Sequence, residues 1–403
     1  MRFPVTFAFK FVVSLQLVVV QSAYAHEHAS NYSTWMALSV ISREQGVLAS
    51  SNDTSAILQA GITQKAFRRL AQQYPHDPST AAIQQYLKKS IVSVVVPVSN
   101  ATKDLTYAMD RLSTGNGLID LYDDTKNETY REAFDALRNS INLNNRNAEG
   151  GLWYFVYPQW SYLDGMYSLA PFYAYYTTLF DAHNKTAIAD MMHQLDLLWQ
   201  HCAANNTGLL VHGYDDSRTA VWANPITGAS PHVWGRSLGW ITMAYVDTLE
   251  ILPRNSPEWA LLQSRFRQLA SALRKAADAT TGAWWQLLDQ PGRAGNYIES
   301  SGSAMFTYAL FKGVRLGYLE NSARGVSAYT DVATRAYEYI ASTFVVNNGN
   351  GTLAYNGTVA VCSLNSTASY EYYVGQPINY NSVLGSAAFV LASLEYEDLV
   401  RRR

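Results

Sequence analysis

Metal and cofactor chemistry is poorly supported by this sequence, because the residues that it needs are scarce. The 403 residues include only 2 cysteines, Cys202 and Cys362, which could form one disulfide or remain two buried thiols. The histidines show no ligand spacing, and Asp215-Asp216 lacks the other ligands of a calcium loop. A phosphate-binding glycine loop and a G-x-S-x-G elbow are also missing. We therefore expect neither a metal nor a cofactor.

Charge is also sparse, at 15% of residues, and the net charge is −2 with no long block of one sign. A nucleic-acid partner would need a clustered basic face, which is not seen here. The final 401–403 arginines are interpreted as a solvated chain end. After the N-terminal segment, no apolar run approaches the roughly 20 residues that span a bilayer, so no membrane association is expected.

The N-terminal segment is typical of a secretory signal peptide. Arg2 precedes the apolar run 11–20, and Ala23-Tyr24-Ala25 has the small-x-small pattern that signal peptidase accepts. We expect residues 1–25 to be removed and the protein to be secreted. The density of Asn-x-Ser/Thr triplets agrees and predicts N-glycans on surface loops. These triplets begin at Asn31, Asn52, Asn100, Asn127, Asn184, Asn205, Asn350, Asn356 and Asn365.

The remaining sequence is dominated by apolar residues at the three- and four-residue spacing of helices. Strand-like runs are short and few, the clearest being 209–212 and 352–355, and no Pro-, Gly- or Ser-rich linker divides the chain. This pattern suits an α-solenoid or a closed double ring of helices. Long loops at 204–233 and 279–299 favour the ring, with a functional mouth on one side. The predicted helices are 33–47, 55–73, 78–94, 115–124, 127–142, 163–181, 184–203, 235–252, 257–278, 300–318, 325–344 and 379–397.

Aromatic residues make up 13% of the chain, which suits sugar binding as well as core packing. One aromatic segment, 153–173, contains a single carboxylate, Asp164, at a predicted helix start. Burial of an unpaired carboxylate is costly, so Asp164 is either a helix cap or a catalyst. An apolar pocket favours the protonated form that a general acid needs.

Two further groups of residues could complete a site. Asp110 either pairs with Arg111, caps the next helix, or acts as the second carboxylate of a glycosidase pair. His212 and Arg236 lie in glycine- and aromatic-rich segments, and a guanidinium can bind a carboxylate through two parallel hydrogen bonds. The alternatives are that His212 is a buried structural histidine and that Arg236 forms an internal salt bridge.

Several long motifs together resemble glycoside hydrolase family 105, the unsaturated rhamnogalacturonyl hydrolases. The motifs are YLDGMYSLAPFYAYY, HGYDDSRTAVWANPITGASPHVWGRSLGWITMAYVDTLEILP, YIESSGSAMFTYALFKGVRLGYL and YYVGQPINYNSVLGSAAFVLASLE. The likeness extends from about residue 33 to 397. It implies an all-α (α/α)6 barrel, formed as a single domain by residues 26–403, with the active site at one mouth.

The resemblance also implies the reaction and the site. The enzyme would hydrate the C4=C5 vinyl ether of a terminal unsaturated galacturonyl residue on rhamnogalacturonan fragments made by a pectin lyase. Asp164 matches the catalytic acid and base, and Asp110 matches the second aspartate of the pair. The predicted substrate-binding residues are His212, Arg236, Trp234, Trp240, Tyr162 and Tyr214.

Two departures from the family pattern leave the neighbouring sugar open. Leu152-Trp153 replaces a stretch that often carries histidine, and Tyr162 stands where tryptophan is common. The alternatives are an unsaturated glucuronyl hydrolase acting on lyase products of other uronate polysaccharides, a catalytically silent carbohydrate-binding protein, or a hydrolase of saturated glycans.

Overall fold

The structure is a computed structural model that describes residues 31–48, 53–204, 206–321 and 328–402. The predicted signal peptide, 1–25, lies outside these residues. Each of the predicted helical segments contains a helix, and both predicted strand runs contain a short strand. The all-α prediction is therefore confirmed.

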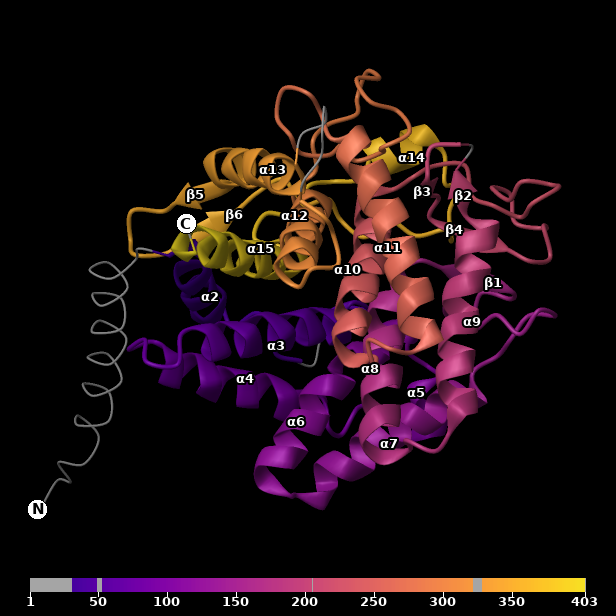
Figure 1. Cartoon of the computed structure of the whole chain (residues 1–403), viewed down its shortest axis with the longest axis horizontal. Helices are drawn as coiled ribbons and strands as arrows, with labels where there is room; N and C mark the ends of the chain where they lie inside the picture. Colours follow the sequence, from indigo (N-terminus) through magenta and orange to yellow (C-terminus); the bar gives the residue numbers. More distant parts are fainter. Residues whose placement is uncertain (1–30, 49–52, 205, 322–327, 403) are drawn as a thin grey trace, which may run out of the picture.

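Six helical segments form an inner ring in which each one contacts the next (Figure 1). The last of them packs against the first, which closes the ring. In ring order they are α3 (Ala56–Gln73), the 3₁₀ helix η1 (Met109–Thr114) with α6 (Gly115–Thr125), α8 (Asp164–Phe180), α10 (Gly235–Ile251), α12 (Ser300–Arg315) and α15 (Val383–Arg401).

An outer helix packs against each inner segment, which gives the double ring of an (α/α)6 barrel. The inner helices are the more deeply buried: α10, for example, is buried without interruption from residue 235 to 249. The outer helices bury one stripe each, as expected for helices that face solvent on one side. They are α2 (Tyr32–Ser42), α4 (Thr80–Val94), α7 (Glu128–Leu143), α9 (Lys185–His201), α11 (Pro257–Ala276) and α13 (Tyr329–Phe344).

Local signals set several helix ends. The Ser256 side chain accepts a hydrogen bond from the Trp259 N–H and Pro257 is the first helical residue of α11, as predicted. The predicted helix 78–94 begins later, at Thr80 of α4. Before it, Asp77 accepts a hydrogen bond from the Ser79 N–H in a turn.

The connections at the N-terminal ends of the inner helices are long, and most of those at the other end are short. The long ones carry small antiparallel strand pairs and two short helices that were not predicted. The elements are β1 (Trp160–Tyr162) paired with β4 (Gly213–Asp215), β2 (Ala203–Ala204) with β3 (Leu209–Leu210), β5 (Val345–Asn347) with β6 (Leu353–Tyr355), and the helices α5 (Ala101–Asp104) and α14 (Tyr370–Val374).

A buried charged cluster fills the barrel below this mouth. Asp247 of α10 accepts hydrogen bonds from Lys65 of α3, from Tyr308 Oη (2.7 Å) and from Lys312 Nζ (2.8 Å) of α12. The cluster ties three inner helices together. Among the described helices, none is both long and apolar enough to cross a membrane.

Candidate active site

A cavity of about 510 Å³ lies at the N-terminal ends of the inner helices. Its wall includes residues 56–58 of α3, Asp110 of η1, Asp164 of α8, Arg236 of α10 and Leu384 of α15. Helix N-termini carry partial positive charge, so this convergence favours an anionic ligand. The volume is in the range of ordinary small-ligand sites.

Asp164 is the first residue of α8 and projects into this cavity from a buried position. Its Oδ2 atom accepts a 2.5 Å hydrogen bond from Ser237 Oγ and lies 3.1 Å from His212 Nε2. The helix-cap alternative is wrong, because Leu163 occupies the N-cap position and no side chain caps the helix. Asp164 is instead held by side chains from two other segments.

The β1–β4 pairing brings His212 to Asp164. This strand pair joins the loop before α8 to the loop before α10, and the Leu163 N–H donates to the His212 carbonyl oxygen at 3.0 Å. The His212 ring is fully buried, with Nδ1 2.7 Å from Tyr373 Oη. His212 therefore lies against the Asp164 carboxylate and is not itself part of the cavity wall.

Asp110 is the second carboxylate of the cavity. Its Oδ2 accepts a 2.8 Å hydrogen bond from Tyr154 Oη, while the buried Oδ1 has no partner among the described protein groups. Burial raises the pKa of Asp110 to about 7; the charge of Asp164 adds to this rise and the Tyr154 hydrogen bond opposes it. Arg111 turns away and donates to Ser140 and Asn144, so neither alternative for Asp110, ion pair or helix cap, is observed.

Arg236 is buried at the cavity wall, and its guanidinium is oriented by backbone carbonyls. It donates to the carbonyl oxygens of Val359 (2.5 Å) and Ala360 (2.7 Å) and stacks 4.8 Å from the Trp234 ring. It forms no ion pair with a carboxylate in the described part of the chain, so the salt-bridge alternative is wrong. Its positive charge is therefore left for a ligand.

The predicted aromatic residues divide into two groups. Tyr162, Trp234 and Trp240 line the cavity, whereas Tyr214 does not. The register explains this difference, because Tyr214 is paired with Ser161, whose neighbour Tyr162 faces the cavity. Alternate residues of a strand face opposite sides, so Tyr214 points away and stacks on His201 at 4.3 Å. The position of Tyr214 does not support contact with substrate.

Three cavity residues from the loop before α8 were not singled out from the sequence. Tyr154 stacks on Tyr162 with 4.3 Å between ring centroids, and Phe155 and Tyr157 add partly exposed rings at the mouth. Aromatic content was the only available signal, and it does not separate site rings from core rings. This loop supplies both the partner of Asp110 and the aromatic wall.

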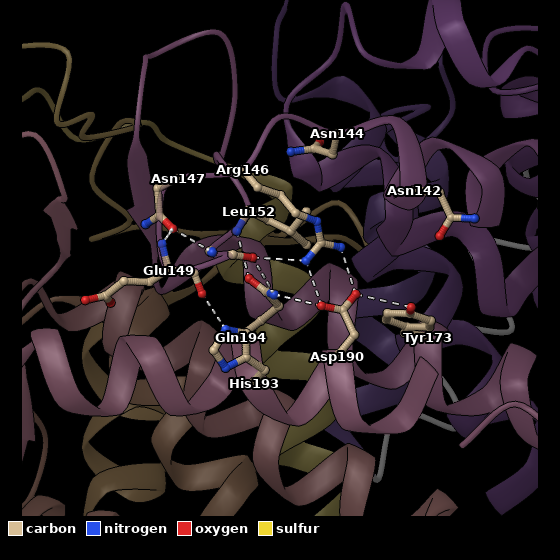
Figure 2. A network of polar contacts seen from close by, with 12 residues as sticks. Asn142, Asn144, Arg146, Asn147, Glu149, Leu152, Tyr173, Asp190, His193 and Gln194 are labelled. Atoms are coloured by element: carbon tan, nitrogen blue, oxygen red, sulfur yellow. Dashed lines mark hydrogen bonds and ion pairs between the residues drawn. The ribbon is translucent and has the colours of Figure 1, made fainter. Parts of the chain in front are cut away.

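Figure 2 shows how the loop is anchored to α9. Arg146 forms a bidentate ion pair with Asp190 (2.7 and 2.8 Å) and also donates to the Gly150 carbonyl oxygen. Gln194 donates to the same carbonyl oxygen and accepts from the Leu152 N–H at 2.8 Å. The Met109 N–H then binds the Tyr154 carbonyl oxygen, so the network fixes both the loop and its contact with η1.

Asp190→Ala should therefore weaken the site as well as the fold. We expect a loss of about 1–3 kcal/mol in unfolding free energy, since Arg146 loses its partner. The value of kcat/KM should fall severalfold because Tyr154 is less firmly placed. Urea unfolding and activity assays measure the two effects. Unchanged activity at reduced stability would show that the network does not position Tyr154.

The two cysteines are both buried and free, so the disulfide alternative is wrong. Cys202 lies in the main core, while Cys362 lines the cavity, where burial raises the pKa of its thiol to about 12. No group of three or more His, Cys, Asp or Glu residues in the described ranges could hold a metal ion.

A closed double ring of helices, with two carboxylates and one unpaired arginine at its mouth, defines a helical-barrel glycoside hydrolase. Comparison with known proteins identifies the family. The profile described as Glycosyl Hydrolase Family 88 matches residues 39–400, and the chain belongs to that family.

Known structures place it more narrowly. A solved glycoside hydrolase of family 105 from C. acetobutylicum is 33% identical and has a TM-score of 0.82; the alignment covers 92% of this chain and 100% of that one. The resemblance to family 105 is thus confirmed. The unsaturated glucuronyl hydrolase of Bacillus sp. GL1 is 12% identical over 93% of this chain and 97% of that one, with a TM-score of 0.66, and shares the fold.

Curated relatives match shorter stretches. Protein Atu3128 of Agrobacterium fabrum is 36% identical over 198 residues, which are 48% of this chain and 83% of that protein. The unsaturated rhamnogalacturonyl hydrolase YesR of Bacillus subtilis is 26% identical over 155 residues, covering 35% of this chain and 43% of that protein.

Proposed function

We propose that this glycoside hydrolase removes the terminal 4,5-unsaturated galacturonyl residue from rhamnogalacturonan oligosaccharides. The observation that carries the proposal is the cavity that holds Asp164, Asp110 and the unpaired cation of Arg236 together. Such a site can bind one carboxylate and supply a proton beside it. The similarity to YesR supports the substrate class.

The proposed reaction is hydration of the vinyl ether. Arg236 binds the sugar carboxylate and so orients the conjugated C4=C5 bond toward Asp164. The Asp164 carboxyl group donates its proton to C4, and positive charge develops at C5 and the ring oxygen. Water then adds to C5 as Asp164 takes back a proton, and the hemiketal opens to release the neighbouring sugar. No covalent intermediate forms.

The balance of charge in the cavity favours a neutral neighbouring sugar. The charged residues that line it within the described chain are Asp53, Asp110, Asp164 and Arg236. One cation matches the single uronate carboxylate, and a second anionic group would face only acids. At about 6 Å and an effective dielectric constant near 20, each of these acids that is ionised would cost such a group roughly 3 kcal/mol, whereas a protonated one would cost nothing. This argument favours rhamnose over the sulfated sugars of glycosaminoglycan fragments.

We also propose that the protein acts outside the cell and carries N-glycans. The proposal depends on the signal-peptide pattern of residues 1–25 and on the sequons. Secretion would place the enzyme where a lyase cuts the polymer into the unsaturated oligosaccharides that are the proposed substrate. Mass spectrometry of the protein secreted from a eukaryotic host would test both points, because an unprocessed N-terminus or unmodified asparagines would contradict them.

The conjugated double bond gives a direct assay. Ultraviolet absorbance should fall when the protein is mixed with rhamnogalacturonan that a lyase has digested, and a rhamnose-ended product should appear. A loss confined to unsaturated glucuronyl disaccharides would instead support the glucuronyl hydrolase alternative. No loss with either substrate, at a measurable binding affinity, would indicate a silent carbohydrate-binding protein.

Arg236→Ala should raise KM far more than it changes kcat. Loss of a charge-assisted bidentate contact costs about 2–3 kcal/mol, so kcat/KM should fall about 100-fold. The matched control is a substrate whose carboxylate is reduced to an alcohol, which should be poor for the wild type and no poorer for the variant. If the wild type cleaves the reduced substrate as well as the acid, Arg236 does not bind the carboxylate.

A further inference from the structure

Tyr373 contacts the catalytic group only through another residue. It lies in the short helix α14, far along the chain from α8, and is fully buried. Its hydroxyl is 2.7 Å from His212 Nδ1, and His212 Nε2 lies 3.1 Å from Asp164 Oδ2. Tyr373, His212 and Asp164 thus form a continuous chain of polar atoms that ends in the cavity.

The polar contacts among Tyr373, His212 and Asp164 favour one tautomer of the His212 ring. If the Tyr373 hydroxyl donates to Nδ1, then Nε2 carries the hydrogen and its N–H faces the Asp164 carboxylate 3.1 Å away, an electrostatic contact outside the angle of a regular hydrogen bond. In the other tautomer a bare Nε2 lone pair faces the carboxylate oxygen. The hydroxyl hydrogen of Tyr373 would then have no acceptor among the described residues.

We propose that Tyr373 is a positioning residue that fixes His212 in the tautomer with hydrogen on Nε2. In that state Asp164 Oδ2 accepts a 2.5 Å hydrogen bond from Ser237 and faces the N–H of His212 at 3.1 Å. Because Oδ2 is occupied, the proton that Asp164 transfers resides on Oδ1. Tyr373 thereby determines which oxygen of Asp164 is reactive. The role of Asp164 in this inference depends on the function proposed above.

The surroundings of Tyr373 hold it firmly in place. Its carbonyl oxygen accepts from Gln286 Nε2 at 3.2 Å, and Gln286 Oε1 accepts from Trp234 Nε1 at 3.1 Å. The Trp234 ring in turn contacts both His212 and Arg236, each at 4.8 Å. One short helix therefore supports the proton-transfer side and the carboxylate-binding side of the cavity together.

Tyr373→Phe tests the proposal, because it removes only the hydroxyl. We expect kcat to fall about 10- to 100-fold, as for other outer groups that orient a functional histidine, with KM changed less than about twofold. Tyr245→Phe is the matched control, since the Tyr245 hydroxyl is equally buried and has no partner in the described structure. It should leave kcat unchanged. Wild-type kcat in Tyr373→Phe would overturn the proposal.

A double-mutant cycle separates positioning from general support. In a His212→Gln background, Tyr373→Phe should have little further effect on kcat, because its target is gone. Independent, additive losses would overturn the proposed route through His212. Thermal unfolding of each variant identifies a loss of kcat that comes from misfolding.

Nitrogen NMR of histidine-labelled protein tests the tautomer without substrate. The wild type should show His212 with hydrogen on Nε2, and Tyr373→Phe should show a mixture. The opposite tautomer in the wild type would overturn the inference even if the enzyme is active. If the tautomer is as expected but no unsaturated substrate is consumed, the proposed function fails and the assignment of Tyr373 to the His212 tautomer stands.

Discussion

Asp164→Asn should lower kcat on unsaturated rhamnogalacturonan fragments by about 1,000-fold or more, because it removes the group proposed both to give and to take the proton. The change is nearly isosteric. The amide oxygen can still accept from Ser237 and face His212, so the site should keep its shape. The rate at which the ultraviolet absorbance falls measures turnover, and calorimetric titration with an unsaturated oligosaccharide should show near-normal binding.

Two further variants serve as controls for this result. Asp181→Asn, at the other end of α8, should leave kcat unchanged, since the Asp181 carboxylate accepts from the Asn184 amide and does not line the cavity. Asp164→Ala guards against deamidation, because an asparagine placed directly before Gly165 can revert to aspartate. If Asp164→Ala keeps most of the wild-type kcat, Asp164 is neither the acid nor the base.

Helices were readily predicted from the sequence because their signal is local. Apolar spacing alone located α3, α8 and α10 to within a few residues, although α10 is buried on all sides. The ends were less certain where polar residues continue the pattern. The predicted helix 33–47 ends at Ser42 in the structure, since the next residues turn through Glu44 and Gly46 at positive φ.

The candidate site was only partly predictable, because its hydrogen bonds join segments far apart in the chain. Asp110, Asp164 and Arg236 could be proposed from their local sequences and from the resemblance to a family. Ser237 and Tyr373 occur in the motifs of that resemblance, yet no local pattern shows that each contacts the Asp164–His212 pair. That information resides in how the loops fold over the barrel mouth.

Tyr214 shows the same limit of prediction from sequence, in this case for a residue that was predicted to bind substrate but turns away from the cavity. It lies next to the predicted site residues in sequence, and glycine and aromatic neighbours suggested contact with sugar. The register of β1 and β4 instead turns its ring toward His201 and Asn147. Strand register depends on the partner strand, so proximity in sequence could not predict the direction of this side chain.

Asp110→Asn should make the protein more stable at pH 8 while impairing catalysis. Burial raises the pKa of Asp110 to about 7 in the folded protein, against about 3.9 in the unfolded chain. A raised carboxyl pKa means that its contribution to stability is complete below pH 4 and is lost as the pH rises through 7. The neutral amide avoids this loss, so the variant should gain roughly 2–4 kcal/mol at pH 8 and little at pH 4.

In the control variant for this prediction, the change in stability at pH 8 should have the opposite sign. The pKa of Asp289 is lowered: burial alone would raise it, but hydrogen bonds from His232 and the Val233 N–H outweigh burial. Asp289→Asn should therefore destabilise the protein at pH 8. Urea unfolding of both variants at pH 5 and pH 8 measures these changes in stability. If Asp110→Asn and the wild type are equally stable at both pH values, Asp110 does not have the buried, proton-binding character assigned to it. A gain in stability together with a loss of kcat would show that this carboxyl group is retained for catalysis at a cost to the fold.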